Sequence, residues 1–200
     1  MTDLIITISL AYLLGSIPFG LLLTKAAGFG DIRNIGSGNI GATNVLRTGN
    51  KWLAALTLLL DGAKGLAAVV LATKFYPDAG RIAGIAALLG HMFPLWLKFK
   101  GGKGVATAIG AITALSWPLG IGIMFAWLVF AFLFRYSSLA AIISLGLSPL
   151  CAASMGNPQL VRFTLIIAIL VIAKHASNIR RLWKGQEPKI GKDKNAAPSP

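Results

Sequence analysis

Long apolar stretches alternate with short polar segments along almost the whole chain, and this pattern predicts a bundle of membrane helices. A bilayer core needs about 20 apolar residues per crossing helix, and fewer where neighbouring helices shield a short one. The first stretch contains Pro18, so we expect a bend there. The pattern therefore predicts an all-α integral membrane protein with seven transmembrane helices, at Leu4–Leu23, Trp52–Ala72, Arg81–Leu97, Val105–Leu115, Leu119–Phe134, Leu139–Ala153 and Leu160–Lys174.

The composition agrees with the membrane class, because 56% of the 200 residues are hydrophobic and only 12% are charged. Successive connections between the predicted helices lie on opposite sides of the membrane. The connections on one side hold fifteen Lys and Arg residues, and those on the other side hold three. The positive-inside rule then places the N-terminus outside, the C-terminus in the cytoplasm and the unusual polar segments at the cytoplasmic face. The same rule accounts for the net charge of +13, so we expect no nucleic-acid partner. We expect residues 1–184 to form one membrane domain and residues 185–200 to be a basic, disordered cytoplasmic tail.

The first cytoplasmic connection is unusually rich in hydrogen-bonding groups. It reads Gly36-Ser-Gly-Asn-Ile-Gly-Ala-Thr-Asn44, and Arg47 follows closely. Glycines let backbone N–H groups turn toward an anion, and Ser, Asn and Thr side chains add donors for phosphate oxygens. The dinucleotide-binding motif with similar glycine spacing needs a strand before it and a helix after it, which this segment lacks. We interpret the segment as an anion-binding loop, with a capped re-entrant turn as the alternative.

A second glycine-rich segment, Gly101-Gly-Lys-Gly104, directly precedes the predicted helix Val105–Leu115. It differs from a Walker A loop, since Leu97 stands at the first glycine position and Gly104 replaces the Ser or Thr that binds magnesium. A lysine at a helix N-terminus still makes an anion site, through the free N–H groups and the helix dipole. Thr107 lies one turn into this helix as a further hydroxyl. The alternative is a positively charged anchor on a flexible turn.

Two further groups of polar residues accompany these loops. Asp61 and Lys64 lie three residues apart within a predicted span, where we favour a structural ion pair. His175 and Asn178 share one face of a helix that leaves the membrane, followed by Arg180 and Arg181. Simple membrane anchoring would explain the arginines but not the histidine and asparagine.

The motifs of several other chemistries are absent from the sequence. No histidines and carboxylates have metal-ligand spacing, and the Gly-x-Ser-x-Gly nucleophile motif does not occur. The His-x-x-x-x-Asp of common acyl-CoA-dependent acyltransferases is missing too, because Trp96 follows His91 at that spacing and Arg180 follows His175. We expect no metal and no cofactor, and a chemistry limited to substrates that are already reactive.

Taken together, the motifs resemble those of the bacterial acyl-phosphate:glycerol-3-phosphate acyltransferases, the PlsY family. The resemblance rests on the first loop, on Asp61-Gly-Ala-Lys-Gly65, on Gly101–Thr107 and on His175–Leu182, in the order of that family. It implies acyl transfer from a fatty acyl phosphate to the sn-1 hydroxyl of glycerol 3-phosphate, which yields lysophosphatidic acid and phosphate in the first committed step of phospholipid biosynthesis. It also implies a monomeric multi-pass protein of the bacterial inner membrane.

The resemblance and the residue chemistry together define a candidate site. We expect Ser37, Asn39, Thr43 and Asn44 to hold the acyl phosphate, and Lys103, Arg47, His175 and Asn178 to hold the phosphate of glycerol 3-phosphate. His175 or the substrate's own phosphate would act as base. A small membrane transporter of organic phosphates is the competing function, although its outer face should then carry polar residues too. The catalytic candidates are Ser37, Asn39, Lys103, His175 and Asn178, and the binding candidates are Gly36, Gly38, Gly41, Thr43, Asn44, Arg47, Gly101, Gly102, Gly104, Thr107, Ser137, Ser138 and Arg180.

Overall fold

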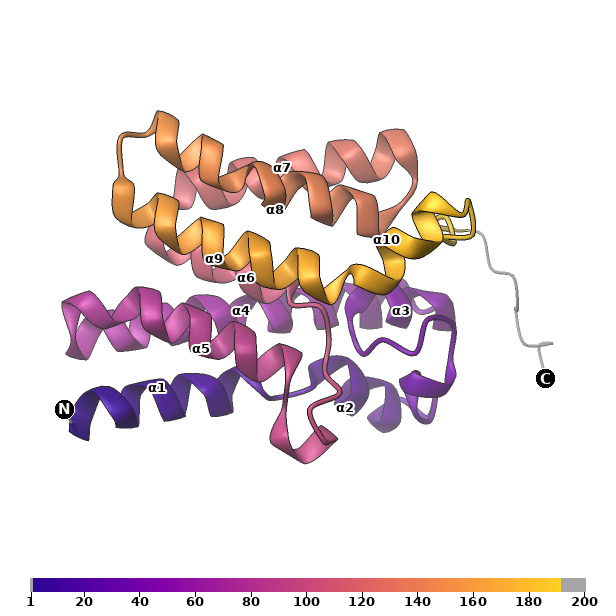
Figure 1. Ribbon diagram of the computed structural model, residues 1–200. Helices are drawn as coiled ribbons and strands as arrows, with labels where there is room; N and C mark the ends of the chain where they lie inside the picture. Colours follow the sequence, from indigo (N-terminus) through magenta and orange to yellow (C-terminus); the bar gives the residue numbers. More distant parts are fainter. Residues whose placement is uncertain (1, 192–200) are drawn as a thin grey trace.

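A computed structural model describes residues 2–191, and the regular elements among them are all helical (Figure 1). Most of their boundaries agree with the apolar stretches of the sequence to within a few residues. The α-helices are α1 (Thr2–Gly15), α2 (Phe19–Ala26), α3 (Ala42–Val45), α4 (Lys51–Phe75), α5 (Gly80–Met92), α6 (Val105–Leu115), α7 (Trp117–Phe134), α8 (Ser137–Ser154), α9 (Pro158–Lys174) and α10 (Ala176–Trp183), and short 3-10 turns lie at Ile32–Asn34, Leu46–Thr48, Pro77–Ala79 and Leu95–Leu97.

Five helical segments in the described part of the chain are long and apolar enough to cross a membrane. The pair α9 and α10, bent by 61°, makes a sixth if it is counted as one span. Helix α6 has eleven residues, which rise about 16 Å, against a hydrocarbon core of about 30 Å. The prediction of an α-helical membrane protein is confirmed, whereas length and composition support five to six of the seven predicted spans.

The long helices run side by side, with α7 and α8 on one side, α6 and α9 in the middle, and α1, α4 and α5 on the other side (Figure 1). The most extensive contacts join α4 to α6, α8 to α9 and α1 to α5. The expected bend at Pro18 is present as the break between α1 and α2. The chain thereby gathers α3, α10 and the first polar loop at the end of the bundle opposite the N-terminus.

Small residues allow the helix backbones to approach closely. A Cβ atom added at Gly65 would lie 2.1 Å from the Thr107 carbonyl oxygen, and one added at Gly110 would lie 2.0 Å from that of Gly62. Close packing of this kind is the main attraction between helices in a membrane, where lipid tails are as apolar as the side chains. The α4–α6 contact therefore depends on glycine on both helices.

The segment after α10 folds back onto the bundle. The N–H of Ile190 donates to the Arg135 carbonyl over 2.7 Å, and Glu187 bonds to side chains of α8 and α10. The expected disorder of the tail from residue 185 therefore does not hold for residues 185–191, because these contacts fix them. Residues 192–200 lie outside the described residues.

Candidate active site

The first polar loop folds around the side chain of Asn44, which is only 2% exposed. Its Oδ1 accepts from the N–H and the hydroxyl of Ser37, over 2.9 and 3.1 Å. Its Nδ2 donates to the carbonyl oxygens of Ile32, Ile35 and Asn39 over 2.8–3.0 Å. Both donor hydrogens of Asn44 are thus engaged inside the loop. The prediction that Asn44 donates to a bound phosphate is wrong, and its role is to hold the loop in shape.

Arg47 lies directly against this loop. A Cβ atom added at Gly36 would lie 2.5 Å from the Arg47 guanidinium nitrogen, and Gly36 also has a φ of +56°. Only glycine combines this positive φ with so close an approach. The Arg47 guanidinium has no hydrogen bond or ion pair with another described residue. It therefore remains available for an anion beside the loop.

The second loop leads into α6 through Gly104, whose φ of +79° supplies the turn that starts the helix. Burial lowers the pKa of the Lys103 ammonium to about 8, and Glu187 opposes this shift. The ammonium makes no hydrogen bond or ion pair within the described part of the chain. Three other cations act on Lys103 in the same direction as burial, namely Arg181, Arg47 and Lys174.

The third polar group lies at the bend between α9 and α10. His175 is 2% exposed, and its Nδ1 lies 2.7 Å from the Val171 carbonyl oxygen. A carbonyl only accepts, so Nδ1 carries the proton and Nε2 of the neutral ring keeps its lone pair. Asn178, one turn further on, is 3% exposed and donates through Nδ2 to Glu187. Its buried Oδ1 has no hydrogen-bond partner among the described residues.

Glu187 is the acidic residue of this cluster, and the sequence analysis missed it. Its carboxylate accepts from Ser138 over 2.6 Å and from Arg181 over 2.7 Å, besides Asn178. Partial burial by itself raises the pKa of Glu187, but these hydrogen bonds outweigh burial and hold the pKa below its usual value. The available signal was that Glu187 is the first acidic residue after Asp78.

These segments, far apart in sequence, meet at one end of the bundle. The hydroxyls of Thr43 and Ser137 lie 3.0 Å apart, which joins the first loop to the start of α8. Glu187 joins α8 to α10 through Ser138 and Asn178. Among the described residues, Arg47, Lys174 and Arg181 interact electrostatically with Lys103 around the single carboxylate of Glu187, so this part of the site carries excess positive charge. An excess of positive charge with free donors suits a phosphorylated substrate.

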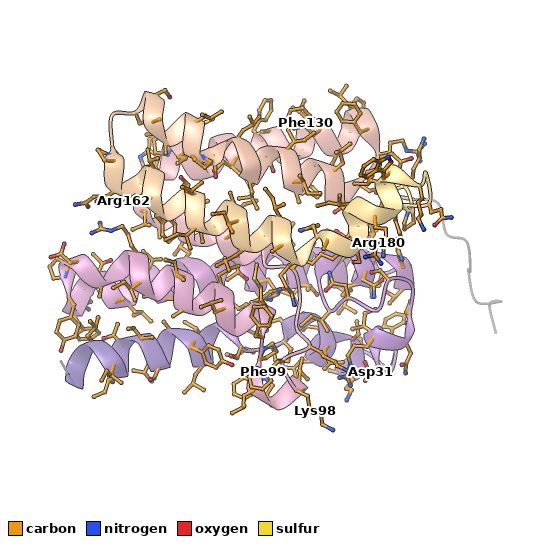
Figure 2. All side chains as sticks on the ribbon, in the orientation of Figure 1. Asp31, Lys98, Phe99, Phe130, Arg162 and Arg180 are labelled. Atoms are coloured by element: carbon orange, nitrogen blue, oxygen red, sulfur yellow. The ribbon has the colours of Figure 1, made fainter. Side chains whose placement is uncertain are left out.

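Two other candidates lie differently from our expectation. The Thr107 hydroxyl is fully buried and donates to the Asp61 carbonyl over 2.9 Å, so the prediction that it faces an anion is wrong. Arg180 is exposed on α10 (Figure 2), and its neighbour Arg181 makes the ion pair with Glu187. Beneath the site, the expected pair of Asp61 and Lys64 is present and buried, with 2.8 Å between Oδ1 and Nζ.

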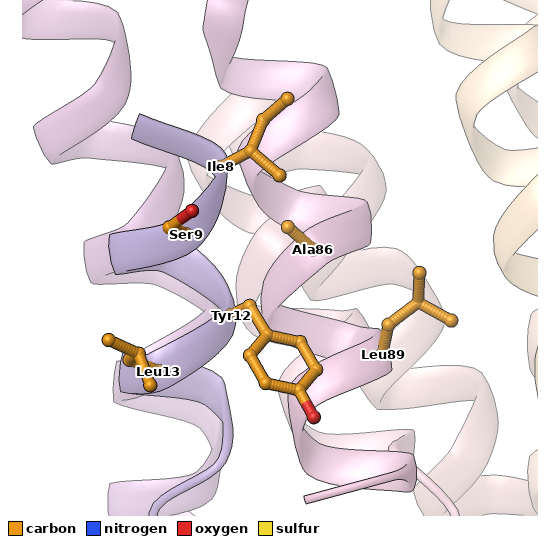
Figure 3. A pocket seen from close by; sticks show the side chains of 6 residues that line it. All are labelled: Ile8, Ser9, Tyr12, Leu13, Ala86 and Leu89. Carbon is orange, nitrogen blue, oxygen red and sulfur yellow. The ribbon is translucent and has the colours of Figure 1, made fainter. Parts of the chain in front are cut away.

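An apolar groove of about 410 Å³ runs between α1 and α5 (Figure 3). The Tyr12 ring lies between the two helices, and its hydroxyl donates to the Phe93 carbonyl over 2.6 Å. Phe93 follows α5 and precedes the segment that leads to Lys103. The groove is lined by Ile8, Ser9, Tyr12, Leu13, Ala86 and Leu89, and the Tyr12 hydrogen bond ties it to the start of the segment that leads to Lys103.

The fold and the site define a class, that of polytopic membrane proteins with a basic, donor-rich site at one end of an apolar bundle. Comparison with known proteins narrows this class. Residues 5–185 match the family profile described as glycerol-3-phosphate acyltransferase. The chain belongs to this family.

The relatives of the chain cover nearly its whole length. A glycerol-3-phosphate acyltransferase of Mesorhizobium japonicum is 56% identical over 94% of this chain and 96% of its own, and one of Jannaschia sp. is 55% identical over 94% and 93%. Among solved structures, PlsY (YgiH), an integral membrane glycerol 3-phosphate acyltransferase, matches in its glycerol 3-phosphate form with a TM-score of 0.89 and 38% identity, covering 94% of this chain and 96% of that one. Its lysophosphatidic acid form matches with a TM-score of 0.86 and 37% identity over the same shares.

Proposed function

We propose that this protein transfers a fatty acyl group from acyl phosphate to the sn-1 hydroxyl of glycerol 3-phosphate, releasing lysophosphatidic acid and inorganic phosphate. The observation that carries the proposal is the cluster around Lys103, where the described residues place four cations with a single carboxylate, and one of these cations, Arg47, lies against the first loop. The family supports the acceptor, and the resemblance of the motifs supports the acyl phosphate donor.

Two phosphate groups have to be held in this reaction, and the site offers cations for both. The unpaired ammonium of Lys103 binds the phosphate of glycerol 3-phosphate, at the N-terminus of α6 where the helix dipole adds positive potential. The guanidinium of Arg47 lies against the first loop, so it binds the phosphate of the donor together with Ser37, Asn39 and Thr43, whereas the sequence led us to expect it on the phosphate of glycerol 3-phosphate. Gly38 and Gly41 let the backbone of the first loop approach the donor phosphate, whereas Gly101 and Gly102 are small because they pack against His91.

The glycerol is oriented by groups that accept as well as donate. The Oδ1 of Asn178 accepts from a glycerol hydroxyl, because its Nδ2 is fixed on Glu187 and its Oδ1 has no other partner among the described residues. Ser137 and Ser138 lie beside it at the start of α8. This arrangement assigns Asn178 to the hydroxyls of glycerol 3-phosphate, which differs from our expectation that it contacts the phosphate.

The chemistry needs positioning and charge stabilisation more than a strong base. An acyl phosphate is a mixed anhydride with a good leaving group, so the acceptor oxygen attacks the acyl carbon and the bond from that carbon to the phosphate oxygen breaks. The hydroxyl proton passes either to the lone pair of His175 Nε2 or to a phosphate oxygen of glycerol 3-phosphate. The released phosphate carries the electron pair of the broken bond and is stabilised by the surrounding cations.

The membrane supplies the apolar part of the donor. The acyl chain lies along the apolar groove between α1 and α5. The protein acts as a monomer in the bacterial inner membrane. It has seven spans, of which the short α6 is shielded from lipid by neighbouring helices. Its N-terminus faces outside and its site the cytoplasm, in line with the distribution of Lys and Arg.

The test is the formation of lysophosphatidic acid by the purified protein in detergent, with glycerol 3-phosphate and either palmitoyl phosphate or palmitoyl-CoA, while phosphate release is followed in parallel. Product with stoichiometric phosphate from palmitoyl phosphate alone supports the proposal. Product from palmitoyl-CoA alone would keep the acceptor and overturn the donor. Lys103→Ala and Asn178→Ala should each lower kcat/KM for glycerol 3-phosphate at least about tenfold, with Asn34→Ala, an exposed residue, as the matched control.

A further inference from the structure

One buried titratable side chain, His91 near the end of α5, has no part in the reaction as described. It is 5% exposed and lies between Asp61 of α4 and the loop Gly101–Gly104. Its Nδ1 faces the Asp61 Oδ1 at 3.6 Å. The buried Nδ1 of His91 has no hydrogen bond to a described residue, and the Asp61 Oδ1 that it faces is paired with the Lys64 ammonium.

The glycine loop rests directly on His91. The N–H of Gly102 donates to the His91 carbonyl over 3.0 Å, and that of Gly101 donates to the Met92 carbonyl over 3.2 Å. A Cβ atom added at Gly102 would lie 2.1 Å from His91 Nε2, far inside van der Waals contact. The loop backbone therefore contacts both the main chain and the imidazole ring of this histidine closely.

The other side of the ring is held by a rigid polar group between helices. Lys64 Nζ lies 2.8 Å from Asp61 Oδ1 and donates to the Ile17 carbonyl over 2.8 Å, at the break between α1 and α2. Buried charges are costly unless they are paired. The Asp61 carboxylate and the Lys64 ammonium therefore stay together, which holds Asp61 in place against the His91 ring. Pressed between Asp61 and Gly102, the His91 ring has little room to yield.

We propose that His91 is a positioning residue of the glycerol 3-phosphate site. Its ring and its carbonyl fix how far Gly101 and Gly102 lie from α5. The position of these two residues in turn determines where Lys103 lies at the start of α6. This inference rests on the proposed function, in which Lys103 binds the phosphate of glycerol 3-phosphate. The pair of Asp61 and Lys64 then contributes to the site as well as to stability, because Asp61 contacts the His91 ring on the side opposite the phosphate-binding loop.

A double-mutant cycle between positions 91 and 102 tests this steric support. Gly102→Ala alone should raise KM for glycerol 3-phosphate about tenfold or more with a smaller change in kcat, because the new methyl group pushes the loop away from the ring. In a His91→Ala background the same change should raise KM less than about threefold, because the space behind the loop is open. His91→Asn serves as a second background, since its shorter amide still faces Asp61 but lacks the Nε2 atom that lies nearest the added methyl group. Thermal melting in detergent checks that each variant folds, and Gly122→Ala, with nothing within 4 Å of the added methyl group, is the matched control.

The outcomes distinguish the positioning role of His91 from the assignment of the phosphate site to Lys103. Equal effects of Gly102→Ala on KM in the wild-type, His91→Ala and His91→Asn backgrounds would overturn the positioning role. If Lys103→Ala leaves KM for glycerol 3-phosphate unchanged, the assignment of the phosphate site fails instead. A melting temperature lowered equally in all His91 variants, with KM and the coupling unaffected, would reduce His91 to a structural residue and refute the inference.

Discussion

The lowered pKa of Lys103 gives a sharp prediction for the pH dependence of substrate binding. Burial lowers this pKa to about 8, so the ammonium is charged at pH 7 and mostly neutral at pH 9. If only the charged form binds glycerol 3-phosphate, KM is multiplied by one plus the ratio of neutral to charged lysine. This factor is about 1.1 at pH 7 and about 11 at pH 9, so KM should rise about tenfold across this interval. The substrate phosphate, with a second pKa of about 6, is mostly a dianion at pH 7 and above, so its own titration adds little to the change.

The assay measures initial rates of lysophosphatidic acid formation against glycerol 3-phosphate concentration at half-unit steps from pH 6.5 to 9.5, with acyl phosphate saturating. The matched variant is Lys103→Arg, whose guanidinium stays charged throughout. Its KM should be raised at pH 7 by the different geometry but should stay flat up to pH 9. A flat wild-type profile, or an equal rise in the arginine variant, would show that the Lys103 charge does not control binding.

Three further predictions concern the fold around the site. Gly110→Ala places a methyl group 2.0 Å from the Gly62 carbonyl oxygen and should destabilise the α4–α6 contact by about 1–3 kcal/mol, read as a lower melting temperature in detergent, whereas Gly122→Ala should leave it unchanged. Asn44→Ala removes two N–H donors from three carbonyls, worth about 1 kcal/mol per N–H, so the melting temperature should fall and kcat/KM with it, while full activity at an unchanged melting temperature would contradict its clamping role. Glu187→Ala should lower the melting temperature more than Glu187→Gln, because the amide still accepts from Ser138 and Asn178, and equal effects would argue against these bonds.

The sequence predicted the helices well because their signal is local. Apolar stretches bounded by Gly, Pro and charged residues set where each helix begins and ends, and Val105–Leu115 was predicted to the residue. The same signal predicted a crossing at Val105–Leu115, although eleven residues are too few to span a bilayer alone. Whether such a helix crosses depends on the neighbours that shield it, which is a property of the packing.

The candidate site divides in the same way. The sequence singled out the glycines, Lys103, Arg47, His175 and Asn178 as candidates, because these residue types in an apolar chain have few other uses. It could not show that Asn44 turns inward, because an asparagine serves equally well as a substrate donor or as a loop clamp, and only the positions of three carbonyls decide between them.

What the sequence determined by itself was the class of the protein, its helices and the chemical character of its loops, since these follow from hydrophobicity and residue type along the chain. Only the tertiary structure decided which groups meet. Glu187 joins Asn178 and Ser138, and His91 lies between Asp61 and Gly102, through contacts between residues that are up to 49 positions apart for the hydrogen bonds of Glu187. Such contacts depend on how the helices pack, and no local pattern in the sequence encodes their geometry.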